Sequence, residues 1–288
     1  MKVAIAGATG FVGEHLIPIL CEKYEDVRCL VRNTSDVSRI SLHNVNLYYG
    51  DISKGASLKE LLDGVDRFIY LVPFSTGYIH EAVSSCVEAG VRRALFVGTT
   101  QIFTYQEPEL KKKILEAEKA IISAALDYTI LRPTLIYGSM LDKNIFKLVC
   151  YLKKYPVIFI PGDGKSLQRP VLVDDICLAI ISAIESPATI RKAYNIAGKD
   201  AITFNEMIKI ICNALCVRRV KIHIPNAFMI FLAKILRVVG IRSYITEDKI
   251  RRLAENKDFA YDDAARDFGY TPLSFEEGIN EAVQRYQT

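Results

Sequence analysis

The sequence lacks several features that would place the protein in other functional classes. No tract of Lys and Arg residues is long enough for a nucleic-acid-binding surface, and the formal net charge is only +4. The seven cysteines include no C-x-x-C pair and their number is odd, so we expect reduced thiols rather than disulfides or zinc ligands. The four histidines form no cluster with metal-ligand spacing. We therefore expect no nucleic-acid partner, no metal site and a cytoplasmic location.

Long uninterrupted apolar runs are also missing. The first apolar run covers only five residues and is needed as a strand, so we expect no signal peptide. The stretch 224–241 is strongly apolar, but it contains Pro225, Asn226, Lys234 and Arg237, whereas a membrane-spanning helix needs about 20 apolar residues. We expect an amphipathic helix packed on the domain. The alternative is a contact with a membrane surface or another subunit, which would make the protein peripheral to a membrane.

Strand-like and helix-like segments alternate through the first half of the chain, which has 288 residues, half of them hydrophobic. Because the strands are apolar throughout, we expect a parallel sheet covered on both faces. The expected strands are 2–6, 27–31, 46–49, 67–72, 94–97 and 128–131, and the helices are 14–22, 57–62, 79–89 and 111–125. The predicted fold is α/β, a Rossmann-type doubly wound parallel sheet with a smaller C-terminal α/β substrate lobe.

The predicted domains are an NAD(P)-binding Rossmann domain over 1–138, joined by segments returning from the second half, and a smaller interleaved substrate lobe over 139–288. Proline and glycine become frequent after Gly138, which favours this division. No internal repeat or low-complexity segment is present.

A glycine-rich turn connects the first strand to the first helix: Gly7-Ala8-Thr9-Gly10-Phe11-Val12-Gly13. Glycine lets the backbone approach a pyrophosphate, and the free N–H groups and dipole of the helix face its negative charge. The sequence therefore predicts a dinucleotide site. Its expected contacts are Gly7, Thr9, Gly10, Phe11, Val12, Gly13, Arg32, Asp51, Leu71, Val72, Pro73 and Pro133.

The end of the second strand bears on which nucleotide binds. NAD-binding folds commonly carry a carboxylate there for the ribose, but this chain reads Val31-Arg32-Asn33. A guanidinium suits a 2′-phosphate, so we favour NADP(H) over NAD(H). Asp51, which follows the third strand, is expected either to contact the adenine or to stabilise a turn.

These segments together resemble the extended short-chain dehydrogenase/reductase family, which includes nucleotide-sugar epimerases and dehydratases. The resemblance covers nearly the whole chain. Besides the glycine turn, it rests on Gly98-Thr99-Thr100, Leu131-Arg132-Pro133 through Gly138, Gly162-Asp163-Gly164, Arg169 through Asp175, and Tyr194 through Gly198. It implies a catalytic Ser or Thr at Thr99 or Thr100, and a nicotinamide beside Pro133.

The chain departs from that family at its Tyr-x-x-x-Lys pair, in which the tyrosine transfers a proton and the lysine lowers its pKa. Aligning Glu118 with the family's usual glutamate puts Leu110 and Ile114 at these positions, and an offset of one residue gives Glu109 and Lys113. This pattern resembles an atypical branch, to which the nucleotide-binding accessory subunit of respiratory complex I belongs. Replacement catalytic groups are sought among Thr99, Thr100, Tyr105 and Tyr137.

Two hypotheses follow. In the first, the chain is an NAD(P)-dependent epimerase, dehydratase or reductase acting on a nucleotide-sugar or similar polar substrate, with Lys165 and Arg169 holding its phosphates. In the second, it is a catalytically silent NADPH-binding structural or redox-sensing protein. Asp174 and Asp175 are expected to cap a helix starting at Ile176 rather than to act in catalysis. The oligomeric state is left open.

Overall fold

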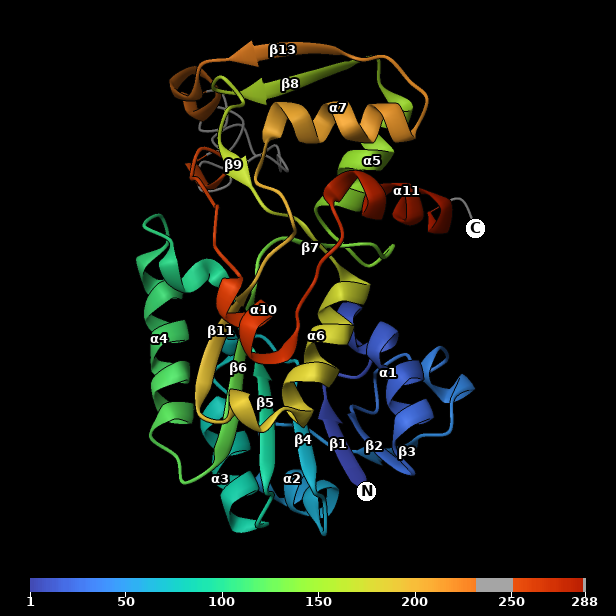
Figure 1. Ribbon diagram of the computed structural model, residues 1–288, viewed down its shortest axis with the longest axis vertical. Coiled ribbons are helices and arrows are strands. Elements are labelled where there is room, and N and C mark those ends of the chain that lie inside the picture. Colours follow the sequence, from blue (N-terminus) through green and yellow to red (C-terminus); the bar gives the residue numbers. More distant parts are fainter. Residues whose placement is uncertain (232–250, 287–288) are drawn as a thin grey trace.

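A seven-stranded parallel sheet forms the centre of the molecule (Figure 1). The computed structural model describes residues 1–231 and 251–286. The strand order is β11-β6-β5-β4-β1-β2-β3. The strands are β1 Lys2–Ala6, β2 Asp26–Val31, β3 Asn46–Tyr49, β4 Arg67–Tyr70, β5 Arg93–Val97, β6 Asp127–Pro133 and β11 Lys192–Ile196. All six expected strands are confirmed, and the direction of winding reverses between β1 and β4.

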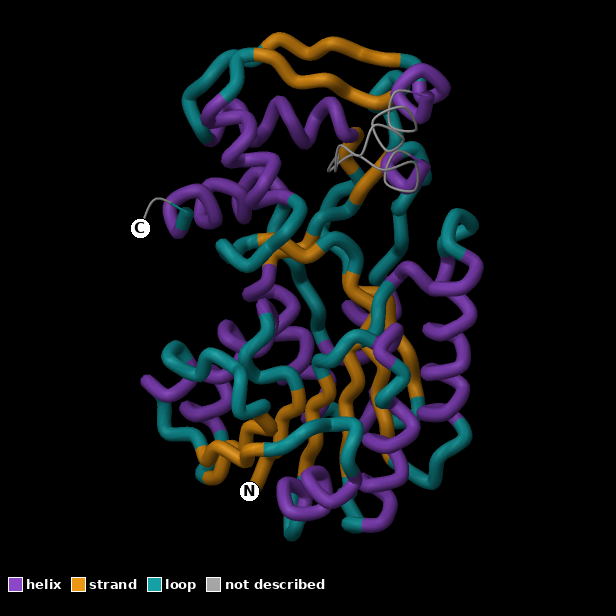
Figure 2. The backbone as a smooth tube through the Cα atoms, turned by 180° about the vertical axis from the view of Figure 1, so that it is seen from behind, coloured by secondary structure: helices purple, strands orange, loops and turns teal. Residues whose placement is uncertain are grey.

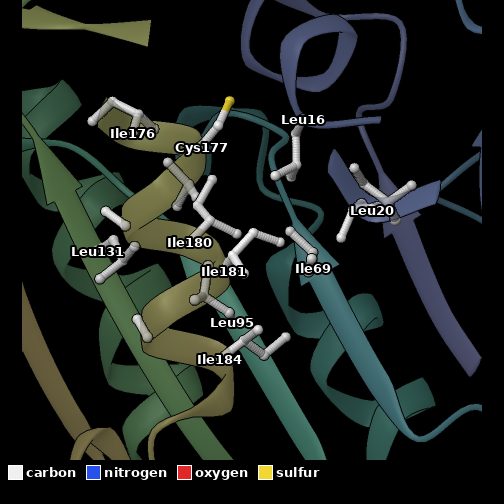
Figure 3. Close-up of a cluster of buried hydrophobic side chains, with 14 of the residues drawn as sticks. Leu16, Leu20, Ile69, Leu95, Leu131, Ile176, Cys177, Ile180, Ile181 and Ile184 are labelled. Carbon is white, nitrogen blue, oxygen red and sulfur yellow. The ribbon is translucent and has the colours of Figure 1, made fainter. Parts of the chain in front are cut away.

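Helices cover both faces of this sheet, as its apolar strands require. One face carries α1 Phe11–Lys23, α6 Val173–Glu185 and α10 Asp262–Phe268, and the other carries α2 Gly55–Leu62, α3 Ile79–Glu88 and α4 Pro108–Ile122. On the first face, Leu16 and Leu20 of α1 lie close to Ile180 and Ile181 of α6, above Ile69 of β4 (Figure 3). The doubly wound fold class is thus confirmed.

The buried Arg93 ties segments from the second half of the chain to the sheet. It is 8% exposed and donates hydrogen bonds to the hydroxyls of Thr129 at 2.5 Å and Thr189 at 2.7 Å, and to the Ala183 carbonyl at 3.0 Å. Burial lowers the pKa of Arg93 to about 10, and the negative charge of Asp127 opposes this only in part. This single side chain connects β5, β6, α6 and the short 3-10 helix η4, Pro187–Thr189.

A smaller lobe lies beyond the carboxyl ends of the strands (Figures 1 and 2). Its helices α5 Ile145–Lys154, α7 Phe204–Ala214 and α11 Phe275–Arg285 enclose a separate apolar core. Capping boxes begin α7 at Thr203 and α11 at Ser274. Strands β8 Val157–Pro161 and β13 Val220–Ile224 pair in parallel as a ribbon against this lobe. The remaining short elements are β7 Ile136–Tyr137, β9 Leu167–Gln168, β10 Val171–Leu172, β12 Ile202–Thr203, η1 Ile40–Leu42, η2 Phe74–Thr76 and η3 Thr100–Phe103.

The expectation for Asp174 and Asp175 is wrong. Helix α6 begins at Val173, three residues earlier than expected, so both aspartates lie in its first turn and neither caps it. Asp174 instead pairs with Arg285 at 2.6 Å and with His15 at 3.6 Å, and Asp175 accepts the Leu273 N–H at 3.0 Å. Their carboxylates connect α6 to α1 and to the C-terminal segment.

Candidate functional site

The glycine turn has the backbone geometry that a pyrophosphate site requires. Gly7 has a φ of +93°, which favours glycine, and its carbonyl accepts the Gly10 N–H at 3.1 Å. Gly13 packs so closely that an added Cβ would collide with the carbonyl oxygens of Gly7 and Ala8. The N-cap of α1 is Gly10, which has no side chain to occupy the first N–H groups of the helix. These groups therefore remain available to an anion.

The other expected cofactor contacts lie along the same edge of the sheet, because parallel strands all end there. Backbone hydrogen bonds join neighbouring strands at this edge. The Gly50 N–H donates to the Val31 carbonyl at 2.9 Å, the Leu71 N–H to the Ala6 carbonyl at 2.9 Å, and the Gly98 N–H to the Leu131 carbonyl at 2.8 Å. The edge thus brings together the glycine turn, Arg32, Asp51, Leu71-Val72-Pro73, Thr99-Thr100 and Pro133.

Arg32 and Asp51 follow adjacent strands. The Arg32 side chain is exposed, and its backbone N–H is fixed by the Ser35 hydroxyl at 3.2 Å. Asp51 accepts hydrogen bonds from the Ser53 N–H at 2.9 Å and hydroxyl at 2.7 Å. These two bonds, with a smaller contribution from the charge of Arg32, hold the pKa of Asp51 below its usual range. Asp51 therefore stabilises a turn, and its contact with adenine stays a prediction.

Thr99 and Thr100 are both engaged in local hydrogen bonds. The Thr100 hydroxyl is buried and donates to the Pro133 carbonyl at 3.2 Å, which joins β5 to β6 where the nicotinamide is expected. The Thr99 hydroxyl accepts the Gln101 N–H at 3.2 Å and so begins the 3-10 helix η3. Their catalytic roles stay predictions.

An ion pair with Arg132 holds Glu118, the residue from which the first of the two registers is counted. Arg132 Nε lies 2.8 Å from Glu118 Oε1 and Nη2 lies 2.5 Å from Oε2, with the glutamate almost fully buried. Counting back from Glu118 along α4 puts Ile114 and Leu110 on the face where the proton-transfer pair is sought. Ile114 is 1% exposed, and Leu110 packs against the same apolar cluster under the sheet. Two hydrocarbon side chains thus occupy this face.

Neither tyrosine considered as a replacement lies on that face. Tyr105 precedes the start of α4 at Pro108 and is 87% exposed, with the Lys111 ammonium 5.2 Å from its ring centroid. Tyr137 is buried in the core of the smaller lobe, 5.1 Å from the Phe275 ring centroid, and burial raises its pKa far above the usual range. The structure therefore brings Thr99 and Thr100 to the cofactor edge, but not Tyr105 or Tyr137.

The two expected substrate contacts lie in the smaller lobe near β9. The Arg169 guanidinium contacts Asp258 at 2.5 Å, the Lys199 carbonyl at 3.2 Å, and the ring of Tyr261, whose centroid is 5.8 Å away. Lys165 is exposed in the preceding loop. Arg169 is thus already held by the protein, and phosphate binding by both residues stays a prediction.

A segment that the sequence reasoning missed joins the two parts of the molecule. We call residues 251–259 the clasp. Glu255 accepts the Thr104 hydroxyl at 2.8 Å and the Tyr105 N–H at 2.8 Å, next to α4. On its other side, the Lys257 N–H donates to Leu167 in β9 at 2.8 Å. The clasp lies between β9 and α10 (Figure 1). Its charges carry no periodic pattern, so no sequence signal indicated these partners.

Two further expectations concern metal ions and membranes. Within residues 1–231 and 251–286, no group of three or more His, Cys, Asp and Glu side chains could hold a metal ion. No helix of the described residues is long and apolar enough to cross a membrane. The expected helix or contact at 224–241 lies mainly outside the described residues, which end at 231 in this region.

The fold and the glycine turn define a dinucleotide-binding α/β protein of the Rossmann type. Residues 7–143 match a family model described as NAD(P)H-binding. Residues 7–143 therefore form an NAD(P)H-binding domain of that family, and the whole chain shares its fold with solved epimerase, dehydratase and reductase structures.

The proteins that resemble this chain have names that describe different functions. "NADH dehydrogenase [ubiquinone] 1 alpha subcomplex subunit 9, mitochondrial" of Arabidopsis thaliana is 25% identical over 77% of this chain, which spans only 60% of that relative's length. A dTDP-glucose 4,6-dehydratase structure from Streptomyces venezuelae with bound NAD has a TM-score of 0.77 at 19% identity, covering 100% of this chain and 97% of that one. The NADPH complex of an Escherichia coli quinone oxidoreductase has a TM-score of 0.79 at 18% identity, covering 98% and 100%. The last two likenesses establish the fold alone.

Proposed function

We propose that this protein binds NADPH as a structural or redox-sensing ligand and does not carry out the Tyr/Lys proton transfer of its family. The observation that carries the proposal is the pair Leu110 and Ile114, which places hydrocarbon on the face of α4 where that chemistry needs a phenol and an ammonium. A positioned acid or base contributes about 10²–10⁴-fold in rate, so its loss makes alcohol–ketone chemistry slow.

The preference for NADPH rests on charge at the end of β2. No carboxylate ends this strand, and the exposed Arg32 that follows it supports recognition of a 2′-phosphate. A guanidinium binds phosphate oxygens through two parallel hydrogen bonds, and such charge-assisted bonds are roughly twice as strong as neutral ones.

A second candidate is an NAD(P)-dependent epimerase, dehydratase or reductase acting on a nucleotide-sugar or similar polar substrate. The observation that favours it is the smaller lobe, which retains its own core over the carboxyl edge of the sheet. Hydride transfer from NADPH to an acceptor such as a quinone does not require the tyrosine, and a quinone oxidoreductase shares this fold. For this candidate, Thr100 beside Pro133 is the group we expect to touch the substrate.

Calorimetry and cofactor absorbance distinguish the candidates. We expect NADPH to bind more tightly than NADH, and Arg32→Ala to weaken NADPH binding about tenfold while leaving NADH nearly unchanged. Arg39→Ala is the matched control, because Arg39 is also exposed but is paired with Glu14 at 2.9 Å. Equal losses for both nucleotides would refute the role of Arg32.

Turnover is tested with the same preparation. Bound NADPH that stays reduced across a panel of nucleotide-sugars and quinones supports the ligand role. Oxidation of NADPH that disappears in Thr100→Ala, with cofactor affinity retained, would overturn it in favour of the enzyme.

A further inference from the structure

The ribbon formed by β8 and β13 has a mixed face turned toward the smaller lobe and a wholly apolar opposite face. Phe159 pairs with Ile222 and Val157 with Val220, and paired residues of parallel strands point to the same side. The alternate residues Ile158 and Ile160 are buried in the core of the smaller lobe. On β13, the Lys221 ammonium lies 2.8 Å from the Asn205 carbonyl and the His223 ring lies 3.0 Å from its side chain, so this face of the ribbon is directed at α7.

The opposite face of the ribbon is open and apolar. It carries Val157, Phe159, Val220, Ile222 and Ile224, and the middle three are 49%, 59% and 41% exposed. The ribbon lies at the end of the molecule farthest from the main sheet (Figures 1 and 2). A strand that is exposed to water on one side normally alternates apolar with polar residues. A contiguous apolar face of this kind indicates a contact surface.

Exposed aromatic side chains continue this surface at both ends of the ribbon. Tyr155, two residues before the start of β8, is 43% exposed. Phe228 and Phe231, in the helical residues 226–231 after β13, are 57% and 60% exposed. Aromatic rings at the border of an apolar surface favour the interface between water and lipid headgroups. We call the outer ribbon face with Tyr155, Phe228 and Phe231 the distal surface.

The segments that build the distal surface are positively charged and contain no acidic residue. Residues 143–162 carry four lysines, and residues 207–231 carry two lysines and two arginines, with neither Asp nor Glu in either segment. The whole chain has a net charge of only +4, so the rest of the chain is net negative. Lys153 and Lys154 are exposed beside Tyr155, with the Lys154 ammonium 5.3 Å from its ring centroid. Asp142, Asp163 and Glu206 directly flank these two segments, and the segments themselves carry an excess of positive charge.

We propose that the distal surface docks on a membrane that carries anionic lipids. The apolar side chains would enter the boundary between headgroups and acyl chains, and the basic residues around them would face lipid phosphates. A second copy of this chain fits less well, because two surfaces with the same excess of positive charge would repel each other. This proposal does not depend on the cofactor role proposed above.

Sedimentation with lipid vesicles tests the proposal on the full chain with NADPH bound. We expect binding to vesicles of phosphatidylcholine mixed with phosphatidylglycerol, little binding to phosphatidylcholine alone, and a loss at high salt. Lys153→Glu combined with Lys154→Glu should weaken binding about tenfold, as should Phe159→Ser. The matched controls are Lys112→Glu and Leu115→Ser on the exposed side of α4, which should leave it unchanged.

The following outcomes would contradict docking of the distal surface on a membrane. No binding to either vesicle, equal binding to both, or equal loss in the α4 controls would overturn the proposal. A dimer that Phe159→Ser converts to a monomer would identify a second copy as the occupant. Protection of β13 amides from hydrogen exchange, lost on deleting residues 232–250, would identify that segment as the occupant. Circular dichroism and NADPH affinity establish that each variant remains folded.

Discussion

Asp175 makes the stability of the protein depend on pH in a direction opposite to that of most carboxylates. It is 7% exposed in the first turn of α6 and accepts the Leu273 N–H at 3.0 Å. Burial raises its pKa to about 6, the negative charges of Asp174 and Glu281 add to this, and the Leu273 hydrogen bond opposes it. Because the pKa of Asp175 is higher in the folded chain than its ordinary value of 3.8, folding favours the protonated acid.

The contribution of Asp175 is therefore fully present below about pH 4 and is lost as the pH rises through about 6. A rise in pKa from 3.8 to about 6 corresponds to about 3 kcal/mol between these limits. Asp175→Asn keeps an acceptor for the Leu273 N–H but carries no charge. We expect the variant to match the parent near pH 4, and to exceed its free energy of unfolding by up to about 3 kcal/mol near pH 8.

Urea unfolding between these pH values measures the difference. The control is Asp200→Asn, which changes an exposed aspartate in a loop of the second half of the chain. A difference between Asp175→Asn and the parent that is constant across the pH range would refute the reasoning, since only titration of Asp175 makes it vary.

Three further variants test the cofactor turn, the clasp and the buried arginine. Gly13→Ala forces a Cβ against two carbonyl oxygens of the turn, so calorimetry should show NADPH affinity reduced about tenfold or more; an unchanged affinity would contradict the geometry. Glu255→Gln removes a charged acceptor, so hydrogen exchange at the Tyr105 amide should quicken while stability falls by only about 1 kcal/mol; unaltered exchange would argue against the clasp. Arg93→Met leaves several buried acceptors and hydroxyls without a donor, and urea unfolding should show a loss of about 3 kcal/mol. An unchanged free energy of unfolding for Arg93→Met would mean that the two threonine hydroxyls form alternative hydrogen bonds without the arginine.

The sheet and the cofactor turn could be predicted because their signals are local. Each strand is a short apolar run bounded by turn residues, and a parallel order follows from the helices between the strands. Each glycine of the turn satisfies a local requirement: Gly7 adopts a positive φ, and Gly13 packs too closely for a side chain. The register obtained by matching Glu118 to the family pattern stays a prediction.

The contacts that could not be predicted all join residues distant in the chain. Strands β8 and β13 pair in parallel over a core that α5 and α7 also build, and neither strand's sequence specifies its partner. The sequence predicts too late a start for α6, because the pair Asp174-Asp175 is typical of residues that cap a helix. In the folded chain, the two carboxylates have partners near the C-terminus instead. The contacts of the clasp are also of this kind, because the hydrogen bond between Glu255 and Thr104 joins residues that lie far apart in the chain.

The retention of a cofactor turn without the proton-transfer pair has a physical basis in this fold. The turn is made of backbone on the α1 side of the sheet, whereas positions 110 and 114 are side chains of α4 on the other side. A fully buried isoleucine contributes about 1.5–3 kcal/mol through burial, whereas a lysine there would require a partner for its charge. Ile114 therefore stabilises α4 against the sheet and leaves the glycine turn unaltered. The glycine turn and the side chains at positions 110 and 114 thus lie on opposite faces of the sheet, so a change at one of these places leaves the packing of the other intact.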